Sequence, residues 1–264
     1  MELPQTFRDA ADITLRLGYS ALWIDALCII QDDDDQADWI AEAPNMGAIF
    51  GNCVLSIAAL TSDDSSVGCC YTHRLPLIHI PCDILTREGN ILQLEAPLAK
   101  RSYQRSHPGN MGHSDSPTLH RRAWVVQERT LAPRTLYFSS AGIYWECNSH
   151  DESDLSKIYT RRKPLHYPFL KENLKAGAAL IFQGQKPMLW HNQWWQLLET
   201  YTKCDLTFIS DRWNAISGMA NIFAAVSQLS LVHGMWRKEL AKEMLWKVAG
   251  ASGNRLSNGR PTWS

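Results

Sequence analysis

The sequence predicts an α/β fold in which helices flank a largely parallel sheet, followed by a mostly helical C-terminal region. Three observations lead to this prediction. A helix-patterned segment leads directly into a continuous apolar run at 19–30, whose apolar residues do not alternate, as expected for a strand buried on both faces. A second apolar run lies at 52–60. From residue 190 onward, apolar residues recur at helical spacing.

The bulk composition limits the class of protein. The 264 residues suit one domain with a large appendage, or two small domains. A net charge of −1 provides no basic surface for nucleic acid or anionic lipid, and the purest apolar run is too short to cross a bilayer. Seven irregularly spaced cysteines argue against a disulfide framework. We therefore predict a cytoplasmic protein without a membrane span or a nucleic-acid partner.

The first third of the chain is predicted to alternate helices and strands. Pro4 lies near a helix start, and Gly18 is a plausible stop. After the apolar run at 19–30, one of Asp32 to Asp35 can cap the next helix, which Pro44 should kink or interrupt. The run at 52–60 then predicts a second buried strand.

The middle of the chain is predicted to contain a hairpin, a helix and two short strands. The hairpin flanks the turn sequence TREGN, and a polar loop at 100–115 follows it. Ser116 and Pro117 predict a helix start, and that helix runs to Leu131. Two short strands surround Ala141-Gly142. We divide the chain into an α/β domain at 1–150, a connector at 151–189 and a helical Trp-rich region at 190–264.

The predicted helix after Pro117 carries a candidate chemical site. Arg121, Trp124 and Glu128 share one face at helical spacing, together with Val125. A large aromatic side chain lowers the local dielectric and raises the pKa of a neighbouring acid, and an arginine can hold an anion bidentately. The structural alternative is that Trp124 belongs to the core and that Glu128 pairs with Arg121 or Arg129.

Asp25 is the second candidate, since a lone acid in a buried run needs partners or a place at the end of a strand. Ligands of open α/β sheets gather beyond the carboxyl ends of the strands, but the pattern favours the alternative of a structural acid bonded to backbone amides. The block Asp32 to Asp35 could hold a hard cation but is better explained as a solvated helix cap. Cys69, Cys70, His73 and Cys82 fit zinc spacing poorly, so we predict free thiols and no metal site.

Two long blocks resemble a known family. LPQTFRDAADITLRLGYSALWIDALCIIQDD, at 3–33, resembles the opening block of the heterokaryon incompatibility (HET) domain of filamentous fungi. RRAWVVQERTLAPRTLYFSSAGIYWEC, at 121–147, resembles the second block of that family. The chain departs from the family pattern because the usual first strand, L-S-Y-x-W-G, is absent and Ala26 stands where serine is expected. We identify it as a truncated member, with its first strand missing and its C-terminus incomplete.

The resemblance implies self/non-self recognition that leads to programmed cell death. It also implies a flavodoxin/TIR-like sheet, since HET domains are regarded as distant relatives of TIR domains, some of which cleave NAD with a glutamate four residues after a tryptophan. By that analogy Glu128 is the catalytic acid and Asp25 faces the same pocket. Trp124 and Trp23 bind substrate, and Arg121 or Arg122 meets the pyrophosphate. NAD is then a substrate, and no bound cofactor is expected.

A non-enzymatic adaptor is the alternative function. Such a protein would act by self-association, or by binding other incompatibility and death-signalling proteins through its Trp-rich helices or a sheet edge. An inactive truncated paralogue is a further possibility. An enzyme requires Glu128 and Asp25 to face one site, whereas an adaptor permits Glu128 to be paired with arginines.

Overall fold

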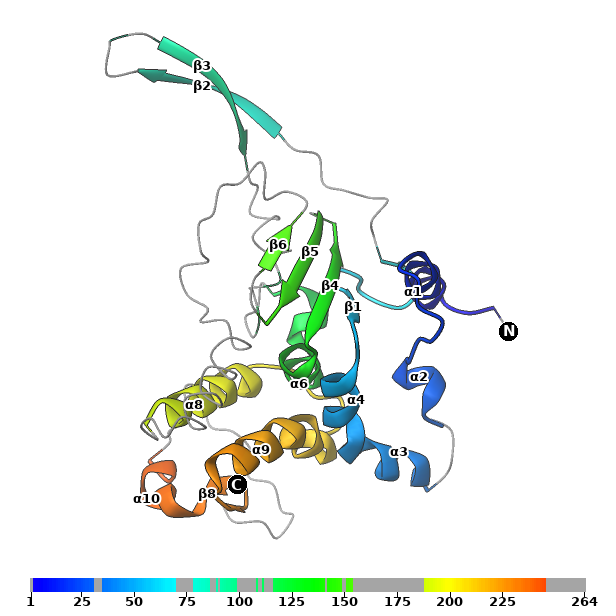
Figure 1. The fold of residues 1–264 in the computed structure, drawn as a ribbon, viewed down its shortest axis with the longest axis vertical. Coiled ribbons are helices and arrows are strands. Elements are labelled where there is room, and N and C mark those ends of the chain that lie inside the picture. Colours follow the sequence, from blue (N-terminus) through cyan, green and yellow to red (C-terminus); the bar gives the residue numbers. More distant parts are fainter. Residues whose placement is uncertain are drawn as a thin grey trace.

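The computed structural model has a mixed α/β fold, in which a four-stranded sheet lies above a layer of helices and a two-stranded hairpin projects away from both (Figure 1). Among the helices of the described ranges, none combines the length and apolarity needed to cross a bilayer. The structure describes residues 2–30, 35–69, 78–85, 89, 91–98, 108, 111, 116–140, 142–148, 151–153 and 188–245.

The sheet has the strand order β1-β4-β5-β6. β1 pairs parallel with β4, whereas the β4–β5 and β5–β6 pairs are antiparallel. The α/β class is therefore confirmed, but the described strands do not form the largely parallel, TIR-like sheet that was expected. The short link between β4 and β5 explains this, because a parallel pair requires a crossover of a dozen or more residues. The strands are β1 (Ser56–Ala59), β4 (Arg134–Ser139), β5 (Gly142–Cys147) and β6 (Asp151–Ser153).

The first helix, α1 (Gln5–Arg16), confirms the helix predicted after Pro4. Gly18 follows it with a φ of 82°, a left-handed conformation that glycine adopts without a steric penalty. The inner face of α1 buries Ile13 in a small cluster with Cys69 and Phe138 of β4. This contact places α1 against the sheet.

The prediction of a buried strand at 19–30 is wrong. The segment contains the short helix α2 (Asp25–Cys28), and much of its apolar surface is exposed, including Leu27 and Ile30. Asp25 lies in the first turn of α2, where its negative charge interacts favourably with the positive end of the helix. This interaction favours a helix over a strand at this position. An unbroken apolar run therefore did not distinguish a strand from a helix.

The largest core cluster lies between helices from both halves of the chain. It joins Val125 and Val126 of α6 with Trp194 of α8 and Met219 of α9.

The segment between 37 and 52 is interrupted at Pro44 by a 3₁₀ turn, as predicted. The division of the chain into domains stays a prediction. The elements are α3 (Ala37–Glu42), η1 (Ala43–Asn45), α4 (Met46–Asn52), α6 (Ala123–Leu131), α8 (Met188–Thr202) and α9 (Asn214–Ser227).

The helix predicted from Ser116 to Leu131 is two separate elements. A 3₁₀ helix, η2 (Thr118–Arg121), ends before Arg122, whose backbone is extended, and α6 begins at the next residue. The break is tertiary in origin. Arg122 forms an isolated parallel bridge with Asp205, whose backbone N–H donates to the Arg121 carbonyl at 2.6 Å. Arg121 therefore does not share the helical face of Trp124 and Glu128.

The remaining elements fit the predicted pattern in part, since a short antiparallel hairpin at 231–236 lies within the region predicted to be helical. The expected hairpin at 77–94 is confirmed as β2 and β3, and the C-terminal region is mainly helical. The block 32–34, Cys70, His73, the side chain of Cys82, most of the connector and the C-terminal tail lie outside the described residues. The elements are β2 (Ile78–Leu85), β3 (Ile91–Leu98), η3 (Ile209–Arg212), β7 (Leu231–Val232), β8 (Met235–Trp236), η4 (Arg237–Glu239) and α10 (Leu240–Glu243).

Candidate functional site

Helix α6 carries the two central candidates one turn apart. Trp124 and Glu128 stand at positions i and i+4, so their side chains are neighbours on one face. Between them, Val125 and Val126 face the core and are buried. The Trp124–Glu128 face is partly exposed, which leaves it accessible from solvent.

The Glu128 carboxyl titrates near neutral pH. Burial raises its pKa from 4.5 to about 7, the Arg122 guanidinium lowers it, and the Asp25 carboxylate raises it further. Within the described residues, no hydrogen bond or ion pair engages this carboxyl group. An acid with a pKa near the working pH and no structural partner is characteristic of functional sites. The alternative in which Glu128 forms an arginine ion pair therefore receives no support.

Asp25 lies close enough to Glu128 to act on it electrostatically, although the two residues are far apart in sequence. It is the first residue of α2 and is partly buried. One of its carboxylate oxygens accepts the Ala26 backbone N–H at 2.8 Å. Asp25 therefore approaches Glu128 from a helix rather than from the end of a strand, and the role of the two acids in one site stays a prediction.

The two candidate tryptophans belong to different aromatic pairs. Trp124 packs edge-to-face on Trp39 of α3, with ring centroids 5.5 Å apart. Trp23 packs edge-to-face on Phe50 of α4, with centroids 6.0 Å apart. Trp39 was not singled out from the sequence, because its partner lies on another helix and nothing local indicates the contact.

The two candidate arginines are both exposed but differ in position. Arg122 directly precedes α6 and acts electrostatically on Glu128. Arg121 ends η2, and its backbone is bound to Asp205. Both side chains can meet an anion from solvent, but of these two arginines Arg122 is the one whose charge lowers the pKa of Glu128.

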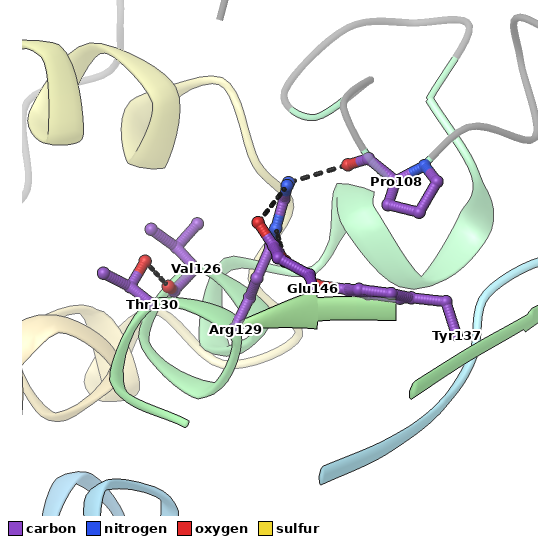
Figure 2. Close-up of polar contacts among 6 residues, drawn as sticks. All are labelled: Pro108, Val126, Arg129, Thr130, Tyr137 and Glu146. Carbon is purple, nitrogen blue, oxygen red and sulfur yellow. Dashed lines mark hydrogen bonds and ion pairs between the residues drawn. The ribbon is translucent and has the colours of Figure 1, made fainter. Parts of the chain in front are cut away.

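A buried ion pair next to Glu128 fixes α6 to the sheet. Figure 2 shows Arg129 pointing at Glu146 of β5, with the guanidinium Nε and Nη2 donating to the two carboxylate oxygens at 3.0 Å each. The Tyr137 hydroxyl donates to the same carboxylate at 2.5 Å, and Arg129 also donates to the Pro108 carbonyl at 2.7 Å. Arg129 is therefore committed to Glu146 and does not neutralise Glu128.

The pKa shifts in this network agree with its geometry. Burial would lower the pKa of Arg129, but the neighbouring Glu146 carboxylate raises it overall, so the guanidinium stays charged. Burial and the same carboxylate raise the pKa of Tyr137 well above its usual value. The network therefore holds one charge pair and a neutral phenol. Sequence reasoning gave Glu146 no role, since its partner is on another element.

Gln127 was also missed and has a structural role. Its side-chain oxygen accepts the backbone N–H of Gly218 on α9 at 2.8 Å. A Cβ added at Gly218 would lie 2.7 Å from the Gly47 Cα on α4. Three helices thus meet at two glycines and one buried amide. Glycines inside helices are disfavoured, so Gly47 and Gly218 were the available signal of close approach.

The arrangement places an acid and an aromatic side chain one turn apart on α6. No group of three or more His, Cys, Asp or Glu side chains within the described ranges could hold a metal ion. Above its pKa, Glu128 presents a negative charge, and the Trp124 indole lies one turn away on the same helix. Such a group can stabilise a developing positive charge on a substrate.

Comparison with protein families assigns the first part of the chain. Residues 1–128 match the family described as Heterokaryon incompatibility protein (HET). The match covers just under half of the chain and is consistent with a truncated HET member. The HET segment contains Asp25 and Trp124 and ends at Glu128, whereas β4 and β5 lie beyond it. No match was found among curated proteins or among solved structures.

Proposed function

We propose that this heterokaryon incompatibility protein triggers cell death by cleaving NAD, with Glu128 as the catalytic residue. The observation that supports the proposal is the state of the Glu128 carboxyl, which has a pKa of about 7 and no hydrogen bond or ion pair among the described residues. A carboxyl kept in this state destabilises the fold when it ionises, which a purely structural residue would avoid. The resemblance to NAD-cleaving TIR domains through the Trp124–Glu128 spacing points the same way.

The proposed step breaks the bond between the nicotinamide nitrogen and the ribose carbon. The bonding electrons leave with nicotinamide, and the ribosyl group becomes a cation that the ionised Glu128 stabilises. Water then adds to this carbon and releases a proton, giving ADP-ribose. Trp124 provides an apolar face for the flat nicotinamide ring, and Arg122 provides positive charge for the pyrophosphate.

Asp25 and Arg122 carry opposite charges and shift the pKa of Glu128 in opposite directions, which allows the assignment to be tested. Cleavage should rise with pH as Glu128 ionises. Asp25→Asn removes a charge that raises the pKa of Glu128, so the midpoint of the pH–rate profile should move to lower pH. Arg122→Met removes a charge that lowers this pKa, so the midpoint should move to higher pH. Shifts in the same direction for both variants would contradict the role of Glu128.

Self-association is the second candidate function, favoured by the exposed apolar side chains at 15–30. Leu15 and Ile30 are 69% and 62% exposed, and Leu27 is 53% exposed. A surface of this kind can drive contact between copies. Under this alternative, Leu27→Lys with Ile30→Lys abolishes cell killing, whereas Glu128→Gln leaves it intact.

The experiment that separates these functions is inducible expression in fungal cells, with NAD and viability followed together. The wild-type protein should deplete NAD before viability falls, and Glu128→Gln should abolish both effects. Glu199→Gln is the matched control, since this glutamate is exposed and pairs only with Lys203 one turn away. Depletion of NAD by Glu128→Gln would refute the assignment, and death without depletion would favour the adaptor.

A further inference from the structure

Asp211 of η3 is a buried acid that the proposed mechanism does not use. It is 9% exposed, and its carboxylate accepts two long hydrogen bonds. The Trp124 indole N–H donates to one oxygen, and the Ser210 hydroxyl donates to the other, each at 3.4 Å. Burying a carboxylate is unfavourable unless it is hydrogen-bonded or paired, so the indole N–H and the hydroxyl help to offset the cost of burying Asp211.

The element that carries Asp211 is anchored independently of Trp124. The Tyr201 hydroxyl on α8 donates to the Arg212 carbonyl at 2.6 Å, and the Asp211 backbone N–H donates to the Phe208 carbonyl at 3.1 Å. The Asp211 carboxylate, which accepts the indole N–H, is therefore carried by an element that is hydrogen-bonded to α8. This element belongs to the region beyond residue 128, outside the HET segment.

Trp124 is held by several contacts, and it packs against the largest core cluster. Its ring also packs edge-to-face on Trp39. Its N–H is directed at Asp211, which fixes the rotation of the ring. Because Trp124 and Glu128 are one turn apart on α6, the orientation of this indole determines the apolar surface beside the carboxyl group.

We propose that Asp211 is a positioning residue of the Glu128 site: by accepting the Trp124 indole N–H it fixes the aromatic surface against which the substrate ring lies. The inference rests on the proposed function of Glu128. It implies that the helical region after the HET segment completes the site, so that the two parts of the chain act as one unit.

The contact is tested by NMR of the eleven indole N–H groups in the full-length chain. Trp124→Phe identifies the Trp124 signal by its loss. Asp211→Ala should move that signal upfield, and Asp211→Asn should restore much of it because an amide oxygen also accepts. Glu243→Ala is the matched control, because Glu243 accepts the Trp195 indole N–H at 2.9 Å and should move only that signal. An unmoved Trp124 signal in Asp211→Ala would overturn the proposal.

The positioning role is tested by kinetics on the same variants. Asp211→Ala should lower kcat roughly tenfold, equivalent to about 1.4 kcal/mol of barrier, with KM changed much less because the pyrophosphate contacts remain. Asp211→Asn should recover most of kcat, and Glu243→Ala should leave it unchanged. Trp124→Phe removes the donor from the other side and should reproduce the loss, which provides a second variant if Asp211→Ala does not fold.

The outcomes separate this inference from the proposed function. If the wild-type chain cleaves NAD and Asp211→Ala matches Glu243→Ala in kcat, the positioning role fails and the proposed function stands. If the wild-type chain does not cleave NAD, the proposed function fails. In that case the positioning role is tested by an NMR titration of the Glu128 carboxyl in the wild type and the variants. A displaced indole admits water to the carboxyl group, so the titration midpoint of Glu128 should be lower in Asp211→Ala and unchanged in Glu243→Ala. An unchanged midpoint in Asp211→Ala would overturn the positioning role.

Discussion

Glu128→Gln should stabilise the folded protein, and more so as the pH rises. Burial raises the pKa of Glu128 from 4.5 to about 7, so the folded chain holds a proton that the unfolded chain releases between these values. The stability of the wild type must therefore fall as the pH rises through this window. At 1.36 kcal/mol per pH unit, the loss is about 1 kcal/mol at pH 5 and about 3 kcal/mol at pH 8. The amide that replaces the carboxyl group cannot ionise, so the variant should regain these amounts.

The assay is urea unfolding at pH 5 and pH 8, followed by circular dichroism. Glu199→Gln is the control, because the Glu199 side chain is 69% exposed and its pair with Lys203 contributes about 0.5 kcal/mol or less. The interpretation of Glu128 as a buried acid with a raised pKa would be refuted if Glu128→Gln were less stable than the wild type at pH 8. It would also be refuted if the variant changed the free energy of unfolding by the same amount at pH 5 and pH 8.

Two further predictions concern packing around the site. Glu146→Ala leaves the buried Arg129 guanidinium without its carboxylate partner. The variant should lower the free energy of unfolding, measured by urea titration, by about 3–5 kcal/mol. A loss below about 1 kcal/mol would contradict the buried ion pair. Gly218→Ala places a Cβ 2.7 Å from the Gly47 Cα and should lower the free energy of unfolding by about 1–3 kcal/mol. Gly51→Ala, with open space around it, should stabilise α4 by up to about 1 kcal/mol. Equal melting temperatures for the two variants would argue against the close approach of α4 and α9.

Elements that depend on local signals were predictable. α1 begins after Pro4 and is followed by Gly18, and the two strands around residues 141–142 are separated by a short turn. These features are determined by backbone preferences within a few residues. The spacing of Trp124 and Glu128 on one face of α6 belongs to the same class.

Elements that depend on distant partners were not predictable. The apolar run at 19–30 predicts a strand, but Asp25 begins a helix within it. The helix predicted across Arg122 is broken by a backbone bridge to Asp205, which nothing near Arg122 indicates. The position of Asp211 beside the Trp124 indole likewise depends on how α6 and η3 pack. At Arg122 and Asp211 the structure depends on tertiary contacts that the local sequence does not indicate, whereas at 19–30 the position of Asp25 in the first turn favours the helix.

The most direct measurement is nicotinamide release by the purified full-length chain at pH 8, resolved by chromatography, for the wild type and Glu128→Gln. We expect the wild type to convert NAD to nicotinamide and ADP-ribose in equal amounts and the variant, although folded and more stable, to release none. Equal release by the two proteins, or no release by a folded wild type, would contradict the assignment of Glu128 as the residue that cleaves NAD.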